Sequence, residues 1–254
     1  MSGTTAGRVE LRVWRQDGPE AEPRFEHYLV TQTENTNVIS ALMEIQRDPR
    51  LSSGERAQTQ IAWEANCLEE VCGACSMVIN GVPRQACSTL LKDLDKPVVI
   101  EPLHKFPVVR DLMVDRSGMF EALKKVKAFI HIDGTHDLGP GPRMSPEAQQ
   151  EAYPYSNCMS CGCCLEVCPQ FNGRSGFIGA AAIGQVALFN LHPTGAMHKT
   201  ERLHAVMGKG GVADCGNAQL CVEACPKDIP LTHAIARVGR DATVQWLKDL
   251  FVKD

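Results

Sequence analysis

The first hundred residues carry the hydrophobic pattern of a small sheet with one helix. Apolar residues alternate with polar ones over 9–13, and a second strand is predicted over 25–30. The segment 37–48 differs, because its apolar residues return at helical spacing until Pro49 ends the pattern. The N-terminal part is therefore predicted to combine strands with a single helix.

Two more strands are predicted further along. The segment 76–79 is apolar and runs into Asn80-Gly81, a pair typical of a two-residue hairpin turn. Another strand is predicted over 97–100. A helical pattern then spans 111–129, so the character of the chain changes shortly after residue 105.

The remainder of the chain is predicted to be helical. A linker rich in Gly and Pro covers 134–146, and helical patterns follow over 179–190, 199–208 and 231–251. The fold class predicted is α+β, with a β-rich domain over residues 1–105 and an all-α domain over residues 106–254.

Composition narrows the possible functions. The 254 residues carry a formal net charge of −4, which gives no basic face for nucleic acid. The longest weakly polar stretch, 177–191, is too short to cross a bilayer. The N-terminus lacks the apolar core of a secretory signal, so the thiols are expected in a reducing compartment, where metal binding is favoured over disulfides.

The twelve cysteines fall into three runs that packing does not explain. The runs are Cys67, Cys72, Cys75 and Cys87; then Cys158, Cys161, Cys163, Cys164 and Cys168; then Cys215, Cys221 and Cys225. The first run has the x4, x2 spacing of plant-type ferredoxins with a distant fourth cysteine, which predicts a [2Fe–2S] cluster. A structural zinc site is the alternative, but its usual spacing differs.

The second run repeats the bacterial ferredoxin pattern C-x2-C-x2-C-x3-C-P, in which the fourth cysteine ligates the other of two clusters. The third run is the partner, but Ala218 occupies its middle ligand position. Cross-ligation predicts two ligand sets. They are Cys158, Cys161, Cys164 and Cys225 for a [4Fe–4S] cluster, and Cys168, Cys215 and Cys221 for a [3Fe–4S] cluster. Cys163 is predicted to be a buried thiol that binds no iron.

With these runs in place, nearly the whole chain resembles the iron–sulfur subunit of succinate dehydrogenase and fumarate reductase, respiratory complex II. The resemblance rests on the plant-type run, on CMSCGCCLEVCP and on CGNAQLCVEACPK. It implies a β-grasp [2Fe–2S] ferredoxin domain followed by a helical bacterial-ferredoxin-like domain. Electrons would pass from FAD in a flavoprotein partner through the three clusters to a quinone. The chain itself would hold no catalytic acid–base residue.

The segment FNLHPTGAMHKTERL particularly resembles menaquinone-linked bacterial enzymes whose anchor is a dihaem cytochrome b. The resemblance then implies haem b in the anchor and a peripheral position on the cytoplasmic face of the bacterial membrane. The charged residues Lys199 and Arg202 are expected at the rim that meets the anchor or lipid headgroups.

The quinone contacts of ubiquinone-reducing relatives do not transfer to this chain. Those relatives carry Trp, Ser and His where this chain has Gly173, Gln170 and Gly216. Pro169 and Gln170 are left as position-matched candidates for the quinone vicinity.

Other functions remain open at this point. The same subunit in a fumarate reductase has the same ligand pattern, and the direction of catalysis depends on potentials that the sequence does not give. Subunits of other dehydrogenases, or of heterodisulfide-reductase-type complexes, usually keep a complete cluster pair, against which Ala218 argues. A free ferredoxin-like carrier and a zinc-binding scaffold are the remaining alternatives.

Overall fold

The computed structural model describes residues 7–131 and 142–251, so most of the linker predicted over 134–146 lies outside the described residues. The chain divides into two compact units. The first unit comprises Met1–Arg116 together with Met159–Glu166, and the second comprises Ser117–Cys158 together with Val167–Asp254. The fold class is α+β, as predicted.

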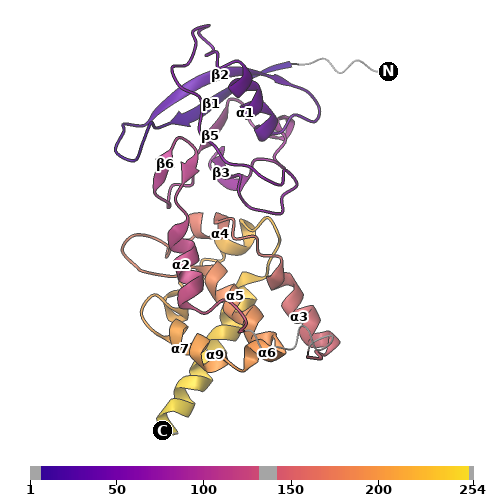
Figure 1. The fold of residues 1–254 in the computed structure, drawn as a ribbon, viewed down its shortest axis with the longest axis vertical. Helices are drawn as coiled ribbons and strands as arrows, with labels where there is room; N and C mark the ends of the chain where they lie inside the picture. The colour runs from indigo at the N-terminus through magenta and orange to yellow at the C-terminus, as the bar shows by residue number, and fades with distance from the viewer. Residues whose placement is uncertain (1–6, 132–141, 252–254) are drawn as a thin grey trace. The chain divides into compact units, whose positions relative to one another are not determined.

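The first unit is built on a five-stranded mixed sheet (Figure 1). The strands are β1 (Gly7–Arg15), β2 (Arg24–Gln32), β3 (Ser76–Ile79), β4 (Val82–Gln85) and β5 (Val98–Glu101), in the order β2-β1-β5-β3-β4. β1 pairs antiparallel with β2 and parallel with β5, while β3 pairs antiparallel with both β4 and β5. The strands predicted from the alternating pattern are therefore all present.

Helix α1 (Val38–Arg47) buries one apolar face in the same core as the sheet. Asn37 caps its N-terminus by accepting a 2.8 Å hydrogen bond from the backbone N–H of Ser40, as expected of an Asn N-cap. The helix ends just before Pro49, where the sequence predicts it to end.

The β3–β4 hairpin turns at Asn80 and Gly81, whose φ angles are +49° and +77°. Both residue types tolerate this left-handed backbone, which a two-residue hairpin requires. Because β3 follows Cys75 and β4 precedes Cys87, the hairpin carries the last two cysteines of the first run.

The helix predicted over 111–129 is wrong in its first turns. The short strands β6 (Val108–Arg110) and β7 (Met113–Val114) pair there, and helix α2 spans only Ser117–Lys125. Asp111 turns the chain at φ +48°, and its buried carboxylate accepts hydrogen bonds from Arg15 and from the backbone N–H groups of Gln16 and Ala62. Asp competes with helix formation in this way, because its side chain offers backbone donors another partner.

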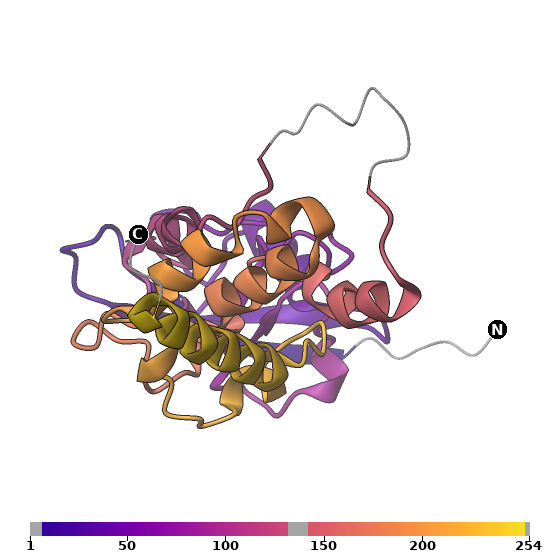
Figure 2. The same ribbon diagram turned by 90° about the horizontal axis from the view of Figure 1, so that it is seen from below.

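The second unit is helical. Its helices include α3 (Pro146–Ser156), α5 (Ala180–Leu191), α6 (Pro193–Ala196), α7 (Lys199–Met207), α8 (Leu220–Glu223) and α9 (Leu231–Phe251). α5 is central and packs against α3, α7 and α9, and Figure 2 shows α9 running across the other helices. The three helices predicted here are present to within a residue, whereas α3 was not predicted. No helix within the described ranges is long and apolar enough to cross a membrane.

Arg202 does not lie at a charged rim, contrary to expectation. It is fully buried, and its guanidinium donates to the carbonyls of Lys127, Gly195 and Phe129 at 2.9, 2.6 and 2.9 Å. Burial lowers its pKa. Arg202 therefore fastens helix α7 to two other segments of the second unit.

Candidate iron–sulfur sites

The loop that carries the first cysteine run directs backbone N–H groups at its own thiols. The N–H groups of Val71 and Cys72 both lie 3.3 Å from Cys67 Sγ, and that of Ala74 lies 3.4 Å from Cys72 Sγ. Leu68 and Glu70 adopt left-handed φ angles of +62° and +58°, which turn successive amides to one side of the chain. The loop therefore presents donors to anionic sulfur.

The thiols of this run lie in two different environments. Backbone hydrogen bonds from Glu69 and Val71 lower the pKa of Cys67 to about 7, so its thiolate is accessible near neutral pH. Burial raises the pKa of Cys75 to about 12. A metal bound to such a buried thiol would replace its proton.

Several residues outside the run hold its ends in place. Asn37 Nδ2, at the start of α1, donates to the carbonyl of Cys87 at 2.9 Å, and Arg116 donates to the carbonyl of Gly73 at 2.8 Å. Ser76 Oγ donates to the same Gly73 carbonyl at 2.8 Å. These contacts fit a [2Fe–2S] cluster, whose ligand loop must be rigid and lined with donors.

Position 73 requires glycine for two reasons: the backbone angle, and the lack of space for a side chain. Its φ is +72°, and a Cβ at this position would lie 2.9 Å from Cys161 Cα and from the carbonyl oxygen of Met159. The segment Met159–Glu166 thus packs directly on the first cysteine loop within the first unit. Glu166 accepts hydrogen bonds from the backbone N–H groups of His104 and Lys105, which fixes the end of this segment.

The second cysteine run is divided between the units along the chain. Cys161, Cys163 and Cys164 belong to the first unit, whereas Cys158 and Cys168 belong to the second, as does Cys225. A hydrogen bond from Cys163 lowers the pKa of Cys161 to about 7. Cys163 is fully buried at the start of the short helix α4 (Cys163–Glu166).

The thiols of Cys168, Cys215 and Cys221 line one hollow in the second unit. Burial raises the pKa of Cys221, and the neighbouring thiols of Cys168 and Cys215 raise it further, so the three groups are close. Ala218 lines the same hollow with a methyl group where a fourth thiol is missing. Asn217 and Gln219 flank it with left-handed φ angles of +52° and +63°. Three thiols around one hollow fit a cluster with three protein ligands.

Pro169 and Gln170 also line this hollow. A Cβ at Gly216 would lie 2.7 Å from Gln170 Nε2, so the glutamine side chain fills the space beside Gly216. The long side chain of Gln170 therefore packs into space that is free only because residue 216 is a glycine.

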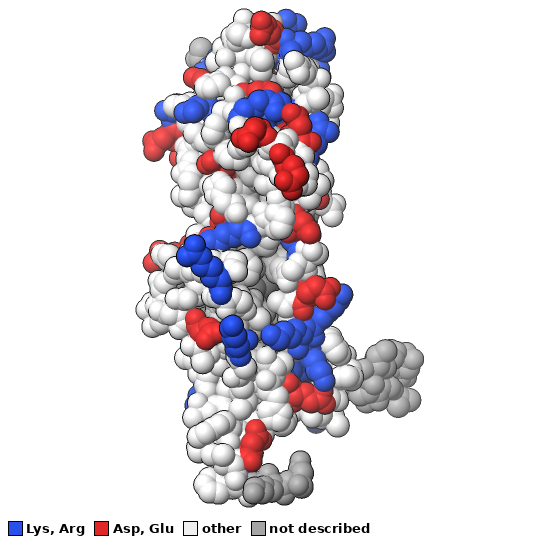
Figure 3. Space-filling view, turned by 90° about the vertical axis from the view of Figure 1, so that its left-hand side faces the viewer, with Lys and Arg blue, Asp and Glu red and all other residues white. Residues whose placement is uncertain are grey.

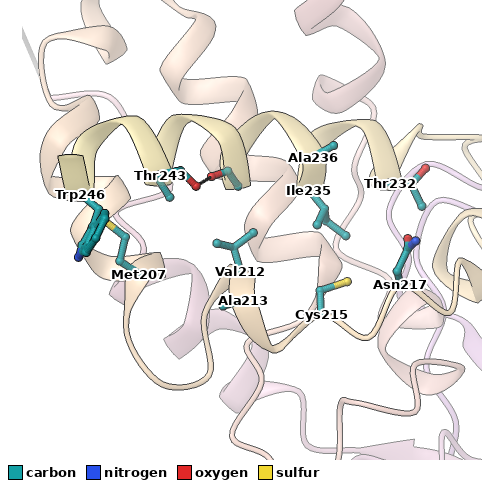
Figure 4. Close-up of a pocket in the computed structure, with 12 residues that line it drawn as sticks. Met207, Val212, Ala213, Cys215, Asn217, Thr232, Ile235, Ala236, Thr243 and Trp246 are labelled. Atoms are coloured by element: carbon teal, nitrogen blue, oxygen red, sulfur yellow. Dashed lines mark hydrogen bonds between the residues drawn. The ribbon is translucent and has the colours of Figure 1, made fainter. Parts of the chain in front are cut away.

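A mostly apolar cavity of about 590 Å³ opens beside this hollow, and Cys215 lines both. It runs along α9 from Thr232 to Trp246 and is walled opposite by Met207, Val212 and Ala213 (Figure 4). The polar side chain of Thr243 donates to the carbonyl of Gly239 within the helix at 2.9 Å, so this wall offers few polar groups.

Sequence reasoning missed Asn37, Gln85 and Arg116 as neighbours of the cysteine runs. Nothing in the local sequence marks them, because each reaches a cysteine segment far away along the chain. Within the described part of the chain, no group of three or more His, Cys, Asp or Glu side chains is arranged to hold a single metal ion.

Comparison with known proteins agrees with this division of sites. Residues 10–121 match the family model described as a 2Fe-2S iron-sulfur cluster binding domain, and residues 154–229 match the 4Fe-4S dicluster domain. Both models fall on the cysteine runs to which the spacing assigns those cluster types.

Curated relatives match over almost the whole chain. The succinate dehydrogenase iron-sulfur subunit of Bacillus subtilis is 56% identical over 246 residues, which cover 97% of each chain. The fumarate reductase iron-sulfur subunit of Wolinella succinogenes is 30% identical, covering 91% of this chain and 96% of that one.

A solved structure shows the same fold. A chain of the Mycobacterium smegmatis Sdh1 complex in the apo form superposes with a TM-score of 0.80 at 26% identity, covering 95% of this chain and 98% of that one. Together with the cysteine runs and their surroundings, these matches show that the chain belongs to the family of iron–sulfur subunits of succinate dehydrogenase and fumarate reductase.

Proposed function

We propose that this chain is the electron-transfer subunit of a succinate:quinone oxidoreductase, with menaquinone as the favoured quinone. It would relay electrons from FAD in a flavoprotein subunit to a quinone at a membrane anchor of the cytochrome b type. The observation that carries the proposal is the order of three cysteine runs with an alanine at one ligand position, in a chain 56% identical to a succinate dehydrogenase subunit.

The ligand sets proposed are those that the spacing predicts. Cys67, Cys72, Cys75 and Cys87 hold [2Fe–2S]; Cys158, Cys161, Cys164 and Cys225 hold [4Fe–4S]; Cys168, Cys215 and Cys221 hold [3Fe–4S]. The N–H groups aimed at Cys67 and Cys72 support the first set, and the shared hollow supports the third. The domain reading, a β-grasp domain over 1–105 and an all-α domain over 106–254, is supported by the mixed sheet and by the helices of the second unit.

Bound clusters would supply single-electron transfer, and the protein would hold and tune them. Backbone N–H groups around Cys67 and Cys72 stabilise negative charge on sulfur. Burial of Cys75, Cys164 and Cys221 excludes water from part of each ligand set. The chain would take part in oxidoreductase chemistry as a relay, without a substrate site of its own.

The exposed side chains at the C-terminal end of α9 favour contact with an apolar partner. Val244, Trp246, Leu247, Leu250 and Phe251 are exposed there, beside the exposed charged residues Lys248 and Asp249. On the face drawn in Figure 3, the lower end is mostly uncharged, with one acidic side chain in view. Exposed apolar patches of this kind mark protein or membrane contacts. The partner proposed is the membrane anchor, and the location proposed is the cytoplasmic face of the membrane. Pro169 and Gln170 are proposed for the quinone vicinity, because they line the hollow of the three-thiol site.

EPR on the natively isolated, air-oxidised protein tests this function. Oxidised [2Fe–2S] and [4Fe–4S] clusters are silent, whereas oxidised [3Fe–4S] carries an unpaired electron. A strong signal with about nine irons per chain, the total for these three cluster types, is expected. Co-purification of an FAD protein and a cytochrome is expected with it, whereas a monomeric protein would indicate a free carrier.

The same subunit in a fumarate reductase is the second candidate, because fumarate reductase subunits are also relatives at 30–33% identity. Rates of succinate oxidation and fumarate reduction, measured on one preparation of the complex with quinone or quinol, separate the two.

A further inference from the structure

Gln85 is a buried amide beside two cysteine runs. It ends strand β4, is 0% exposed, and lies two residues before Cys87. A buried amide without hydrogen-bond partners destabilises the fold, so the partners of this amide are informative. They are Cys75 Sγ at 3.5 Å from Oε1, Ser76 Oγ at 2.8 Å from Nε2, and Cys163 Sγ at 3.7 Å from Nε2.

The orientation of this amide depends on the state of Cys75. A free Cys75 thiol donates to Oε1. Once Cys75 binds iron it has no proton. Oε1 and the Cys75 sulfur would then both be hydrogen-bond acceptors, with no hydrogen between them. Turning the amide by 180° exchanges its oxygen and nitrogen at nearly fixed positions.

The turned amide satisfies every group around it. Nε2 then faces Cys75 Sγ and can donate to it. Oε1 then faces the Ser76 hydroxyl, which can donate to it, and the Cys163 sulfur. The single hydrogen of the Cys163 thiol is used in the bond to Cys161. The Gly73 carbonyl keeps its hydrogen bond from Arg116 when Ser76 Oγ turns away from it, so Ser76 is the donor available to Oε1.

We propose that Gln85 is a positioning residue for the [2Fe–2S] cluster, donating Nε2–H to Cys75 Sγ, and that the Ser76 hydroxyl holds its amide in that orientation by donating to Oε1. The proposal rests on the proposed role of Cys75 as a ligand. A hydrogen bond to ligand sulfur stabilises the reduced, more negative cluster, so Gln85 raises its potential.

The test is the midpoint potential of the [2Fe–2S] cluster in the purified complex, measured by EPR titration. Gln85→Leu removes the amide at similar size. It is expected to lower the reduced-to-oxidised ratio at a fixed potential about tenfold, which is about 59 mV for one electron. Thr89→Val is the matched control, because Thr89 Oγ1 donates at 2.7 Å to the backbone carbonyl of Gln85. It should leave the potential unchanged. An unchanged potential in Gln85→Leu overturns the proposal.

The Ser76 part has its own variants. Ser76→Ala removes the donor to Oε1 and is expected to lower the potential in the same direction by a smaller amount. Ser76→Thr keeps a hydroxyl donor and should keep the original potential. If Ser76→Ala leaves the potential unchanged, Ser76 does not orient the amide.

A measurement on the unaltered protein covers the case in which Gln85→Leu fails to assemble. Pulsed EPR of the reduced cluster, in protein whose glutamine is labelled with 15N only in the side-chain amide, should show a coupling to that nitrogen. A cluster without this coupling contradicts the proposal. If the first cysteine run gives no [2Fe–2S] signal at all, the proposed function fails instead, so the two failures are distinguishable.

Discussion

Single residues decide what each cysteine run can bind. Ala218 is the clearest case, because a methyl group stands where the repeat of the bacterial pattern would place a fourth thiol. Gly73 is a second case, since both its φ angle and its distance to Cys161 exclude a side chain. Neither effect involves a charge or a catalytic group, yet each bears on the ligand set proposed for its cysteine run.

Restoring the missing thiol should change the cluster type. In Ala218→Cys we expect a fourth ligand to complete a [4Fe–4S] cluster, so that the oxidised-state EPR signal of [3Fe–4S] is lost. Ala218→Val adds bulk but no thiol, and it should keep the signal. A strong [3Fe–4S] signal in Ala218→Cys, with all cysteines reduced, would contradict the ligand assignment.

Substitution of Gly73 should disturb the first site much more than substitution of another glycine with positive φ. Gly81→Ala meets open space, so it should cost only the strain of a left-handed residue, about 1–2 kcal/mol. Gly73→Ala adds contact with backbone atoms at 2.9 Å. We expect it to reduce the [2Fe–2S] signal of the dithionite-reduced complex, while Gly81→Ala retains it. Equal signals in both variants would mean that the loop relaxes freely.

At the scale of elements, buried charged residues fix the positions of segments that the hydrophobic pattern alone does not determine. Asp111 lies in a turn where the predicted helix should begin. Its carboxylate ties the β6–β7 turn to β1 through a 3.0 Å hydrogen bond from Arg15. Arg202 has a similar role in the second unit, where its guanidinium donates hydrogen bonds to three backbone carbonyls. The sequence predicted most strands and long helices, because their period is local. It did not predict these ties, because Arg15 lies 96 residues from Asp111, and Lys127 and Phe129 lie 75 and 73 residues from Arg202.

The Arg15 cluster should contribute strongly to stability. Arg15 is fully buried and pairs with Asp111 and Glu26. Arg15→Met leaves a buried carboxylate without its cation, which typically costs about 3–5 kcal/mol. Lys124→Met removes an exposed ion pair with Glu121 and should cost less than about 1 kcal/mol. Thermal unfolding of the purified complex, followed by loss of visible absorbance, compares the two. Similar melting temperatures would contradict this account.

At the scale of the whole molecule, the question is which surface meets the membrane anchor. The apolar end of α9 is the surface that the exposed side chains favour. Here the comparison with relatives adds what the single chain does not contain, since family members function as subunits of a larger complex.

A charge placed on this surface should release the subunit. Leu250 is 54% exposed, so Leu250→Asp is expected to leave folding intact and to abolish co-purification with the cytochrome. Tyr153, which is 60% exposed on α3, provides the matched control, and Tyr153→Asp should co-purify normally. Retention of the cytochrome by Leu250→Asp would exclude this end of α9 as the contact.

The sequence by itself determined the cysteine spacing, from which the cluster types are predicted, and the elements whose hydrophobic period is local. Ligand spacing is readable because the backbone must wrap each cluster within a few residues. Only the tertiary structure decided that Arg202 is buried, that Asp111 turns the chain between β6 and β7, and that Gln85 lies between Cys75 and Cys163. These contacts join residues distant in sequence, and a polar residue becomes part of a site only when folding removes water from around it.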